Sequence, residues 1–173
     1  MKHWYMLTLV GADQPGIVAA LTEALYRGGG NLGEASMVRL GGNFTIMLMV
    51  QSAASSAPLR ALVEGAVRQF GLHVHIDEIQ AQLHQHPEPN VRVVVHGADR
   101  AGIVAEVTGA LARAGLNILD LDSEVGGTEA QPIYIMLLQG FVAGGATALE
   151  PVLADVRKSG VEVHITSIDT LIG

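Results

Sequence analysis

Residues 11–19 read Gly-Ala-Asp-Gln-Pro-Gly-Ile-Val-Ala, and residues 97–105 read Gly-Ala-Asp-Arg-Ala-Gly-Ile-Val-Ala. The two stretches agree at seven of nine positions and stand 86 residues apart. The agreement continues as far as Asn31 and Asn117. It returns near the end of each copy at an offset of 89 residues, which fits a longer hairpin in the second copy. An internal repeat of this length predicts two copies of one structural unit of roughly 80 residues.

Each copy shows the same order of predicted elements. In the first copy the strand signals cover residues 6–10, 31–40, 44–50 and 72–79. Apolar side chains at helical spacing predict two helices, one from Pro15 to the glycines at 28–30 and one over residues 59–70. The second copy predicts strands or hairpins over 91–96, 117–139 and 161–171, and helices over 101–114 and 146–159.

The order βαββαβ has a simple compact solution. It is a four-stranded antiparallel sheet with both helices on one face, the ferredoxin-like arrangement of the α+β class. The predicted domains are residues 1–83 and 91–173, joined by a short and fairly stiff linker at residues 84–90. Two helices leave the other sheet face and the sheet edges uncovered, and modules of this size bury little surface, so we expect a homodimer.

The composition excludes several classes of function. The chain has 173 residues and a formal net charge of −7, which argues against broad contact with nucleic acid or an anionic membrane. It has no cysteine, so it has no disulfide and no thiolate metal site. The N-terminal residues run into an apolar stretch that is too short for a signal peptide or a membrane span. We therefore expect a cytoplasmic protein.

The repeated motif, residues 11–19 and 97–105, places a helix start directly after a strand. Backbone N–H groups in the first turn of a helix are unpaired and lie at the positive end of its dipole, so they suit a carboxylate. Gly16 and Gly102 lack a Cβ, which lets a ligand approach the backbone closely. Asp13 and Asp99 add a carboxylate that can pair with an α-ammonium group. The repeated motif therefore could hold a zwitterionic amino acid, with N–H groups for its carboxylate and an aspartate for its ammonium group.

These residues also have ordinary structural interpretations. The two aspartates can cap the helix, with Pro15 in its first turn. The two glycines can serve close helix–strand packing. Asn31 and Asn117 offer a donor and an acceptor each, but are also common turn residues.

Histidines give the one metal-like pattern that the sequence offers. His73 and His75 lie on the same face of a predicted strand, a possible pair of metal ligands. No third ligand is evident from the sequence, and His84 and His86 in the linker are expected to be solvated. We therefore predict no metal site and no cofactor.

The repeated motif gives the chain a family resemblance. A strand ending in Gly-Ala-Asp-x-x-Gly-Ile-Val at a helix start, followed about fifteen positions later by Gly-x-Asn, resembles the ACT domain family of small-molecule sensors. The resemblance covers essentially the whole chain as two tandem modules. The pair of modules is most similar to the glycine cleavage system transcriptional repressor family.

The resemblance implies a set of site residues. In ACT regulators the loop of one module and the asparagine of a neighbouring module commonly hold a ligand, so each loop is expected to combine with the asparagine of the other copy. Many ACT domains have asparagine where this chain has aspartate, and the second copy has alanine in place of the proline. The candidate ligand-binding residues are Gly11, Ala12, Asp13, Gln14, Pro15, Gly16, Ile17, Asn31, Gly97, Ala98, Asp99, Gly102, Ile103 and Asn117.

The resemblance also implies a function. It indicates a non-catalytic regulator that binds an amino acid, glycine or serine, and represses glycine cleavage genes through a protein partner. That partner would be a DNA-binding activator, and the chain itself would not contact DNA. The alternatives are an ACT-fold structural or enzyme-regulating subunit without amino-acid binding, and a small ferredoxin-like enzyme. Against an enzyme, the sequence has no cysteine nucleophile, serine-centred elbow, phosphate loop or complete metal set.

Overall fold

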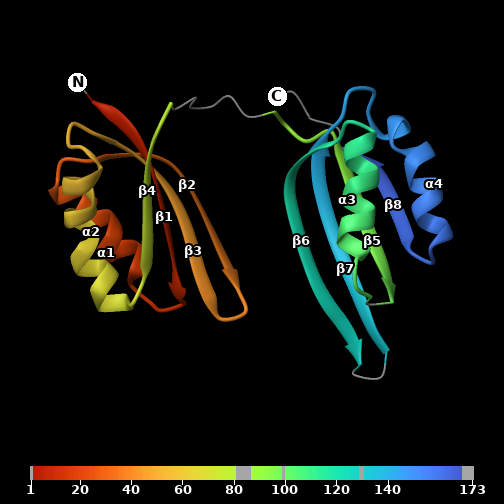
Figure 1. Cartoon of the computed structure of the whole chain (residues 1–173), viewed down its shortest axis with the longest axis horizontal. Helices are drawn as coiled ribbons and strands as arrows, with labels where there is room; N and C mark the ends of the chain where they lie inside the picture. The colour runs from red at the N-terminus through yellow and green to blue at the C-terminus, as the bar shows by residue number, and fades with distance from the viewer. Residues whose placement is uncertain (1, 81–86, 99, 129–130, 169–173) are drawn as a thin grey trace. The chain divides into compact units, whose positions relative to one another are not determined.

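In the computed structural model, which describes residues 2–80, 87–98, 100–128 and 131–168, the chain divides into two units, Met1–Gln85 and His86–Gly173. Each unit has the element order βαββαβ (Figure 1). Residues 84–86 of the predicted linker lie outside the described residues. None of the helices in the described ranges is long and apolar enough to cross a membrane.

The first unit is one antiparallel sheet with two helices on one of its faces (Figure 1). The strand order is β2-β3-β1-β4. Its described elements are β1 (His3–Ala12), α1 (Ile17–Arg27), β2 (Asn31–Leu40), β3 (Asn43–Ser52), α2 (Ser56–Phe70) and β4 (His73–Ile79).

The second unit repeats this arrangement with the strand order β6-β7-β5-β8. Both sheets are antiparallel throughout, so the predicted α+β fold of two tandem ferredoxin-like modules is confirmed. The described elements are β5 (Val91–Ala98), α3 (Ile103–Arg113), β6 (Asn117–Thr128), β7 (Gln131–Phe141), the 3-10 turn η1 (Ala146–Ala148), α4 (Glu150–Lys158) and β8 (Glu162–Ser167).

Local chemistry explains where the elements begin and end. Gly41 and Gly42 both have a positive φ, 57° and 77°, as a two-residue hairpin turn between strands of the normal twist requires. The predicted helix 146–159 is divided, because Pro151 has no N–H with which to continue the preceding 3-10 turn. The helix α4 therefore starts only at Glu150. The predicted strand 161–171 ends at Ser167 within the described residues.

Each unit has its own apolar core between the sheet and the helices. In the first unit Leu7 and Leu9 point toward α1 and α2 and are fully buried, as are Leu21 on α1 and Leu59 on α2. In the second unit the matching strand β5 contributes three buried valines, and its core includes the fully buried Leu111 and Leu153 of the two helices. The alternation along each central strand leaves the intervening side chains on the other sheet face.

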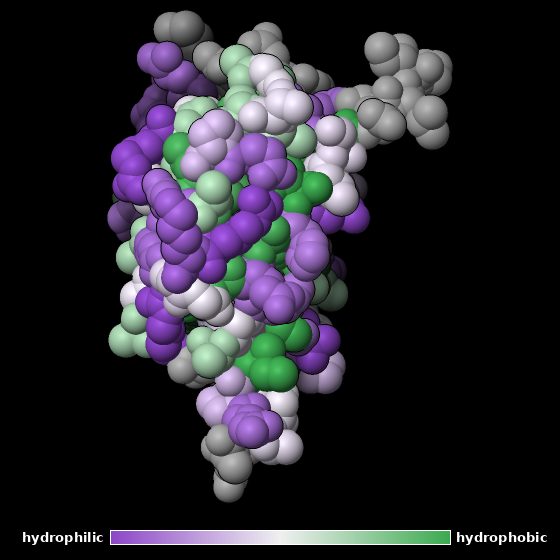
Figure 2. Space-filling view, turned by 90° about the vertical axis from the view of Figure 1, so that its right-hand side faces the viewer, coloured by the Kyte–Doolittle hydropathy of each residue, from purple (hydrophilic) through white to green (hydrophobic). Residues whose placement is uncertain are grey.

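Hydrophilic residues cover much of the outer side of α4 in the second unit (Figure 2). Figure 2 shows the side of the second unit that carries α4, where hydrophilic residues cover much of the surface and hydrophobic ones show between them. On α4 the acidic and basic side chains neutralise one another, with Glu150 2.8 Å from Arg157 and Asp155 2.7 Å from Lys158. The charges of these two pairs on α4 therefore offset one another.

Candidate ligand-binding loops

The predicted ligand-binding loop of the first unit connects β1 to α1. The backbone N–H of Asp13 donates to the carbonyl of Gly42 in the β2–β3 hairpin at 3.0 Å. The side-chain amide of Gln14 donates to the carbonyl of Phe70, the last residue of α2, at 3.3 Å. These two bonds attach the loop to the hairpin on one side and to the second helix on the other.

Asp13 does not cap the helix. The helix α1 begins at Ile17, its N-cap residue is Gly16, and no side chain makes the capping hydrogen bond. The Asp13 carboxylate instead lies 2.7 Å from Nε of Arg39 on β2. The capping interpretation of Asp13 is therefore wrong, because the helix begins four residues after it, with Gly16 at the N-cap position. For the same reason Pro15 precedes the helix and is not in its first turn.

The loop glycines are required by backbone angle and not by close packing. Gly16 has φ 92° and Gly102 has φ 87°, in the left-handed region that favours glycine. A Cβ placed on Gly16 would meet only Phe70, at an ordinary 3.7 Å, and one on Gly102 would meet nothing within 4 Å. Gly11 differs, since its Cβ would lie 2.7 Å from Leu72. The packing interpretation thus fits Gly11 and fails for the other two.

A cavity of about 460 Å³ opens beside this loop. Five of its residues were predicted from sequence, whereas Gly11 and Ala12 do not line it. Three lining residues of the β2–β3 hairpin were not predicted from the sequence, namely Met37, Arg39 and Phe44. The lining residues are Asp13, Gln14, Pro15, Gly16, Ile17, Val18, Ala19, Met37, Arg39 and Phe44.

The hairpin register explains why Arg39 reaches the loop. Arg39 lies opposite Phe44, and Phe44 lies opposite Gly11 at the end of β1. Arg39 therefore lies two strands away from Gly11, across the hairpin that turns at Gly41 and Gly42. The cavity therefore combines a cation, a carboxylate and the first-turn N–H groups of α1, which have no acceptor within the helix. The side chains are accessible, with Asp13 27% and Arg39 68% exposed.

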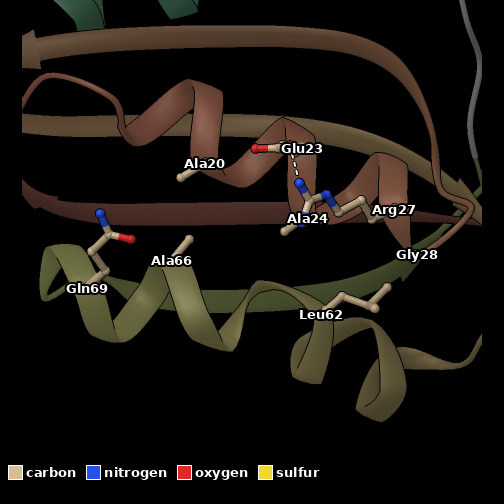
Figure 3. A pocket seen from close by; sticks show the side chains of 8 residues that line it. All are labelled: Ala20, Glu23, Ala24, Arg27, Gly28, Leu62, Ala66 and Gln69. Carbon is tan, nitrogen blue, oxygen red and sulfur yellow. Dashed lines mark hydrogen bonds and ion pairs between the residues drawn. The ribbon is translucent and has the colours of Figure 1, made fainter.

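A different cavity of about 410 Å³ lies between α1 and α2 (Figure 3). Small residues line much of it, including Ala20, Ala24 and Ala66. Its two charged side chains, Glu23 and Arg27, form an ion pair with each other at 2.6 Å along one helix. This cavity therefore offers a zwitterion less charge complementarity than the β1–α1 loop does.

The second unit has a different set of charges at its loop. Asp99 lies outside the described residues. Arg100 pairs with Glu106 in the first turn of α3 and donates to the hydroxyl of Ser159 at 3.1 Å. The hydrogen bonds from Arg100 and Ser159 lower the pKa of Glu106 below its ordinary value.

The second unit has no arginine at the position that corresponds to Arg39. In its sheet Gly97 lies opposite Tyr134, and Tyr134 lies opposite Val125, so Val125 takes the place of Arg39. The two loops are thus not chemically equivalent.

The remaining predicted residues lie in three kinds of place. Ile17 and Ile103 begin their helices and are buried, so a ligand would meet their backbone. Ala98 is the exposed last residue of β5. Asn31 and Asn117 are exposed at the start of β2 and β6, opposite Gln51 and Phe141, at the end of the sheet away from their own unit's loop. The combination of each loop with the asparagine of the other unit stays a prediction.

The amino-acid sequence is similar to those of two characterised kinds of protein. The chain is 24% identical over 161 residues to the glycine cleavage system transcriptional repressor of Escherichia coli (strain K12), covering 91% of this chain and 80% of that protein. It is 26% identical over 164 residues to the phosphoserine phosphatase SerB2 of Mycobacterium tuberculosis (strain ATCC 25618 / H37Rv), covering 92% of this chain and 39% of that protein.

Solved structures match the fold over nearly the whole chain. An unknown protein from Galdieria sulphuraria superposes with a TM-score of 0.78 at 23% identity, over 98% of this chain and 100% of the other. A candidate glycine cleavage system transcriptional repressor superposes with a TM-score of 0.75 at 18% identity, over 98% and 99%. Two segments, residues 3–77 and 91–158, match the ACT domain. The chain therefore belongs to the ACT domain family and contains two such domains in tandem.

Proposed function

We propose that this tandem ACT protein is a non-catalytic regulator that binds a small amino acid, glycine or serine. The observation that carries the proposal is the Asp13–Arg39 pair, which lines a cavity at the start of α1. The amino acid's ammonium group binds Asp13. Its carboxylate binds the first-turn N–H groups of α1 and the Arg39 guanidinium, which turns from Asp13 to the ligand. No cofactor is needed for this recognition.

The second loop is proposed as a weaker site of the same kind. It would use Gly97, Ala98, Asp99, Gly102 and Ile103. Its nearest cation, Arg100, is held by Glu106, and no arginine stands at the position that Arg39 has in the first unit. The first unit is therefore expected to dominate binding.

Titration calorimetry of the full chain tests amino-acid sensing directly. We propose that glycine or serine releases or absorbs measurable heat at millimolar or lower concentration, with the other amino acids as comparison ligands. A flat titration with all twenty would remove the sensing function. It would leave the alternative of a structural or enzyme-regulating subunit, which the partial match to a phosphoserine phosphatase favours.

The regulatory output is proposed to pass through a protein partner, a DNA-binding activator of glycine cleavage genes. The similarity to the E. coli repressor supports the gene target, and the net charge of −7 supports the absence of direct DNA contact. Within the described part of the chain, six basic side chains are also already paired with carboxylates. These six are Arg27, Arg39, Arg68, Arg100, Arg157 and Lys158.

In an electrophoretic mobility assay, the isolated protein is expected not to shift a glycine cleavage promoter fragment, even at low salt, where attraction to phosphates is strongest. A shift is expected only when the activator is added, with the activator alone as the control. Tight, salt-sensitive binding by the isolated protein would contradict the proposal.

We also propose that the chain forms a homodimer in the cytoplasm. Apolar side chains stand exposed on the face of the first sheet that lies away from α1 and α2, with Val38 56%, Leu40 73% and Met47 44% exposed, and burying them would be favourable. Sedimentation velocity at micromolar concentration is expected to give about twice the monomer mass of 18.1 kDa. A single monomer species across the concentration range would count against self-association.

A further inference from the structure

Two histidines and a glutamate gather on the second sheet, on the face away from its helices. His96 comes from β5, and Glu162 and His164 come from the neighbouring strand β8. His96 lies directly opposite Glu162, and His164 lies opposite Val94, so all three side chains share one face. One potential ligand atom from each lies within 4.8 Å of the others. In the part of the chain that the structure describes, no other trio of metal-ligating side chains meets this condition.

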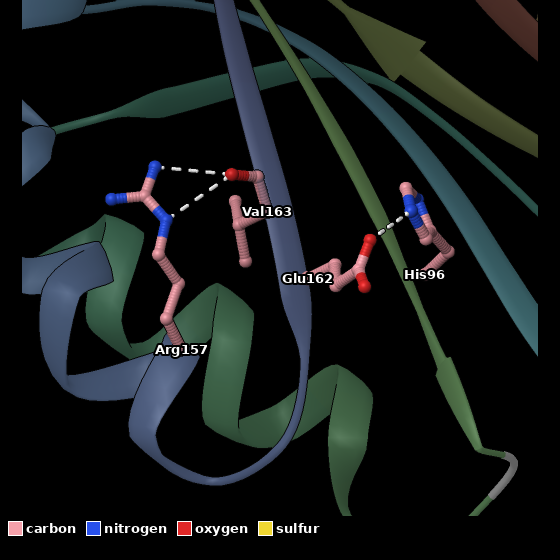
Figure 4. A network of polar contacts seen from close by, with 4 residues as sticks. All are labelled: His96, Arg157, Glu162 and Val163. Carbon is pink, nitrogen blue, oxygen red and sulfur yellow. Dashed lines mark hydrogen bonds and ion pairs between the residues drawn. The ribbon is translucent and has the colours of Figure 1, made fainter.

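The contacts among the three side chains are close. Nε2 of His96 lies 2.8 Å from Oε2 of Glu162, and Figure 4 shows these two side chains pointing toward one another from adjacent strands. The rings of His96 and His164 stack with centroids 5.3 Å apart and an interplanar angle of 23°. Two imidazoles and a carboxylate are therefore already held around one point of the surface.

We propose that His96, Glu162 and His164 bind a divalent transition-metal ion, with Zn²⁺ as the best fit. Imidazole nitrogen and carboxylate oxygen are ordinary zinc ligands, at about 2.0–2.2 Å from the ion. The three ligand atoms already lie within 4.8 Å of one another, and in the proposed site the ion replaces the hydrogen bond between His96 and Glu162. Three protein ligands leave a fourth position for water or for an exogenous ligand.

The site is both reachable and supported by its surroundings. The side chains of His96 and Glu162 are 37% and 73% exposed, so an ion can enter from solvent. Val163 lies between the two ligands of β8, and its carbonyl accepts two hydrogen bonds from Arg157 of α4, at 3.2 and 3.0 Å (Figure 4). The guanidinium thus fastens this edge strand at the residue between the ligands, which holds Glu162 and His164 in register.

A cavity of about 500 Å³ lies on the same sheet face, next to the three side chains and lined by their cross-strand neighbours. It is lined by Val94, the cross-strand neighbour of His164, and by Ile135, the cross-strand neighbour of His96. Asp122 and Glu124 of β6 line its other side. The ion would therefore border a space that could admit a small ligand.

The first unit provides an internal comparison. By register the positions of His96, Glu162 and His164 correspond to Val10, His73 and His75. The first unit thus has two histidines on one strand, but a valine in place of the third ligand. His75 is also paired with Asp77 at 3.0 Å. The difference between one valine and one histidine therefore determines which unit can supply three ligands.

The test is calorimetric titration of untagged, EDTA-treated full-length protein with zinc sulfate. We expect one ion per chain. His96→Val, which copies the first unit, and His164→Ala should each weaken binding by at least about 100-fold, because even partners in the outer shell of metal sites contribute 10–100-fold. Cobalt(II) should give a visible absorption band with the parent protein that disappears in both variants.

Two control variants separate this site from other histidines. His75→Ala in the first unit and a His84→Ala/His86→Ala double variant should bind zinc as the parent does. Thermal unfolding of each variant without metal confirms that it is folded. The proposal is overturned if zinc does not bind, if His96→Val binds as tightly as the parent, or if the linker variant loses binding.

Discussion

Asp13→Ala is expected to raise the dissociation constant of the amino acid by about tenfold or more. The carboxylate makes a charge-assisted hydrogen bond to the ligand's ammonium group, and the loss of such a bond costs about 1.5–3 kcal/mol. The effect on binding can be separated from an effect on stability, because Asp13 does not cap α1 and its ion pair with Arg39 is accessible to solvent. Such pairs contribute about 0–1 kcal/mol to stability, so the variant should remain folded. Calorimetric titration with glycine and serine measures the change.

Two further variants make this result specific. Arg39→Val copies the second unit, where Val125 has the same register position, and should weaken binding by removing the cation that meets the ligand's carboxylate. Asp99→Ala reports on the second loop and should have a smaller effect. If both aspartate variants bind as well as the parent, the two carboxylates have no part in recognition.

Leu9→Ala should reduce the free energy of unfolding by about 2–5 kcal/mol, because it removes a large side chain from a filled core and leaves a cavity. Leu9 is 0% exposed and lies on β1 between Ile46 and Val74 of the neighbouring strands. It is also four residues before Asp13, so the same variant shows how far the loop depends on this core. Urea denaturation followed by circular dichroism measures the loss.

The matched control is the next residue on the same strand. Val10 points to the opposite face of the sheet and is 40% exposed, so Val10→Ala removes little buried surface and should cost less than about 1 kcal/mol. Equal losses for the two variants would mean that the two faces of β1 are not buried as described.

Much of the fold could be predicted because its signals are local and appear twice. The Gly-Gly turn at Gly41 and Gly42 fixes a hairpin whatever surrounds it, and the apolar spacing in α1 and α2 identifies one buried face of each helix. The predicted ends of helices and strands were less accurate than their positions in the chain. Pro15 and Asp13 are typical helix-start residues, but the left-handed Gly16 delays the helix to Ile17.

The site was less predictable because it depends on which strands become neighbours. Arg39 meets Asp13 only after β2 has paired with β3, and β3 with β1. His96 and Glu162 meet only because β5 and β8 are adjacent in the sheet, although 66 residues separate them in the chain. The histidine pair at 73 and 75 was visible because it lies within one strand. Contacts between strands require the register, which one sequence does not state.

The two units differ at register-matched positions that leave their cores untouched. Arg39 corresponds to Val125 and Val10 to His96, and all four side chains are at least partly exposed. A covalently fused duplicate always supplies its halves in a one-to-one ratio, so one half can lose a chemical group while the other retains or gains it. Each half is thereby free to specialise while the other keeps the chemistry that both once shared. The tandem chain in this sense encodes two chemically unlike modules in one gene, an asymmetry that two copies of a single-module chain would lack.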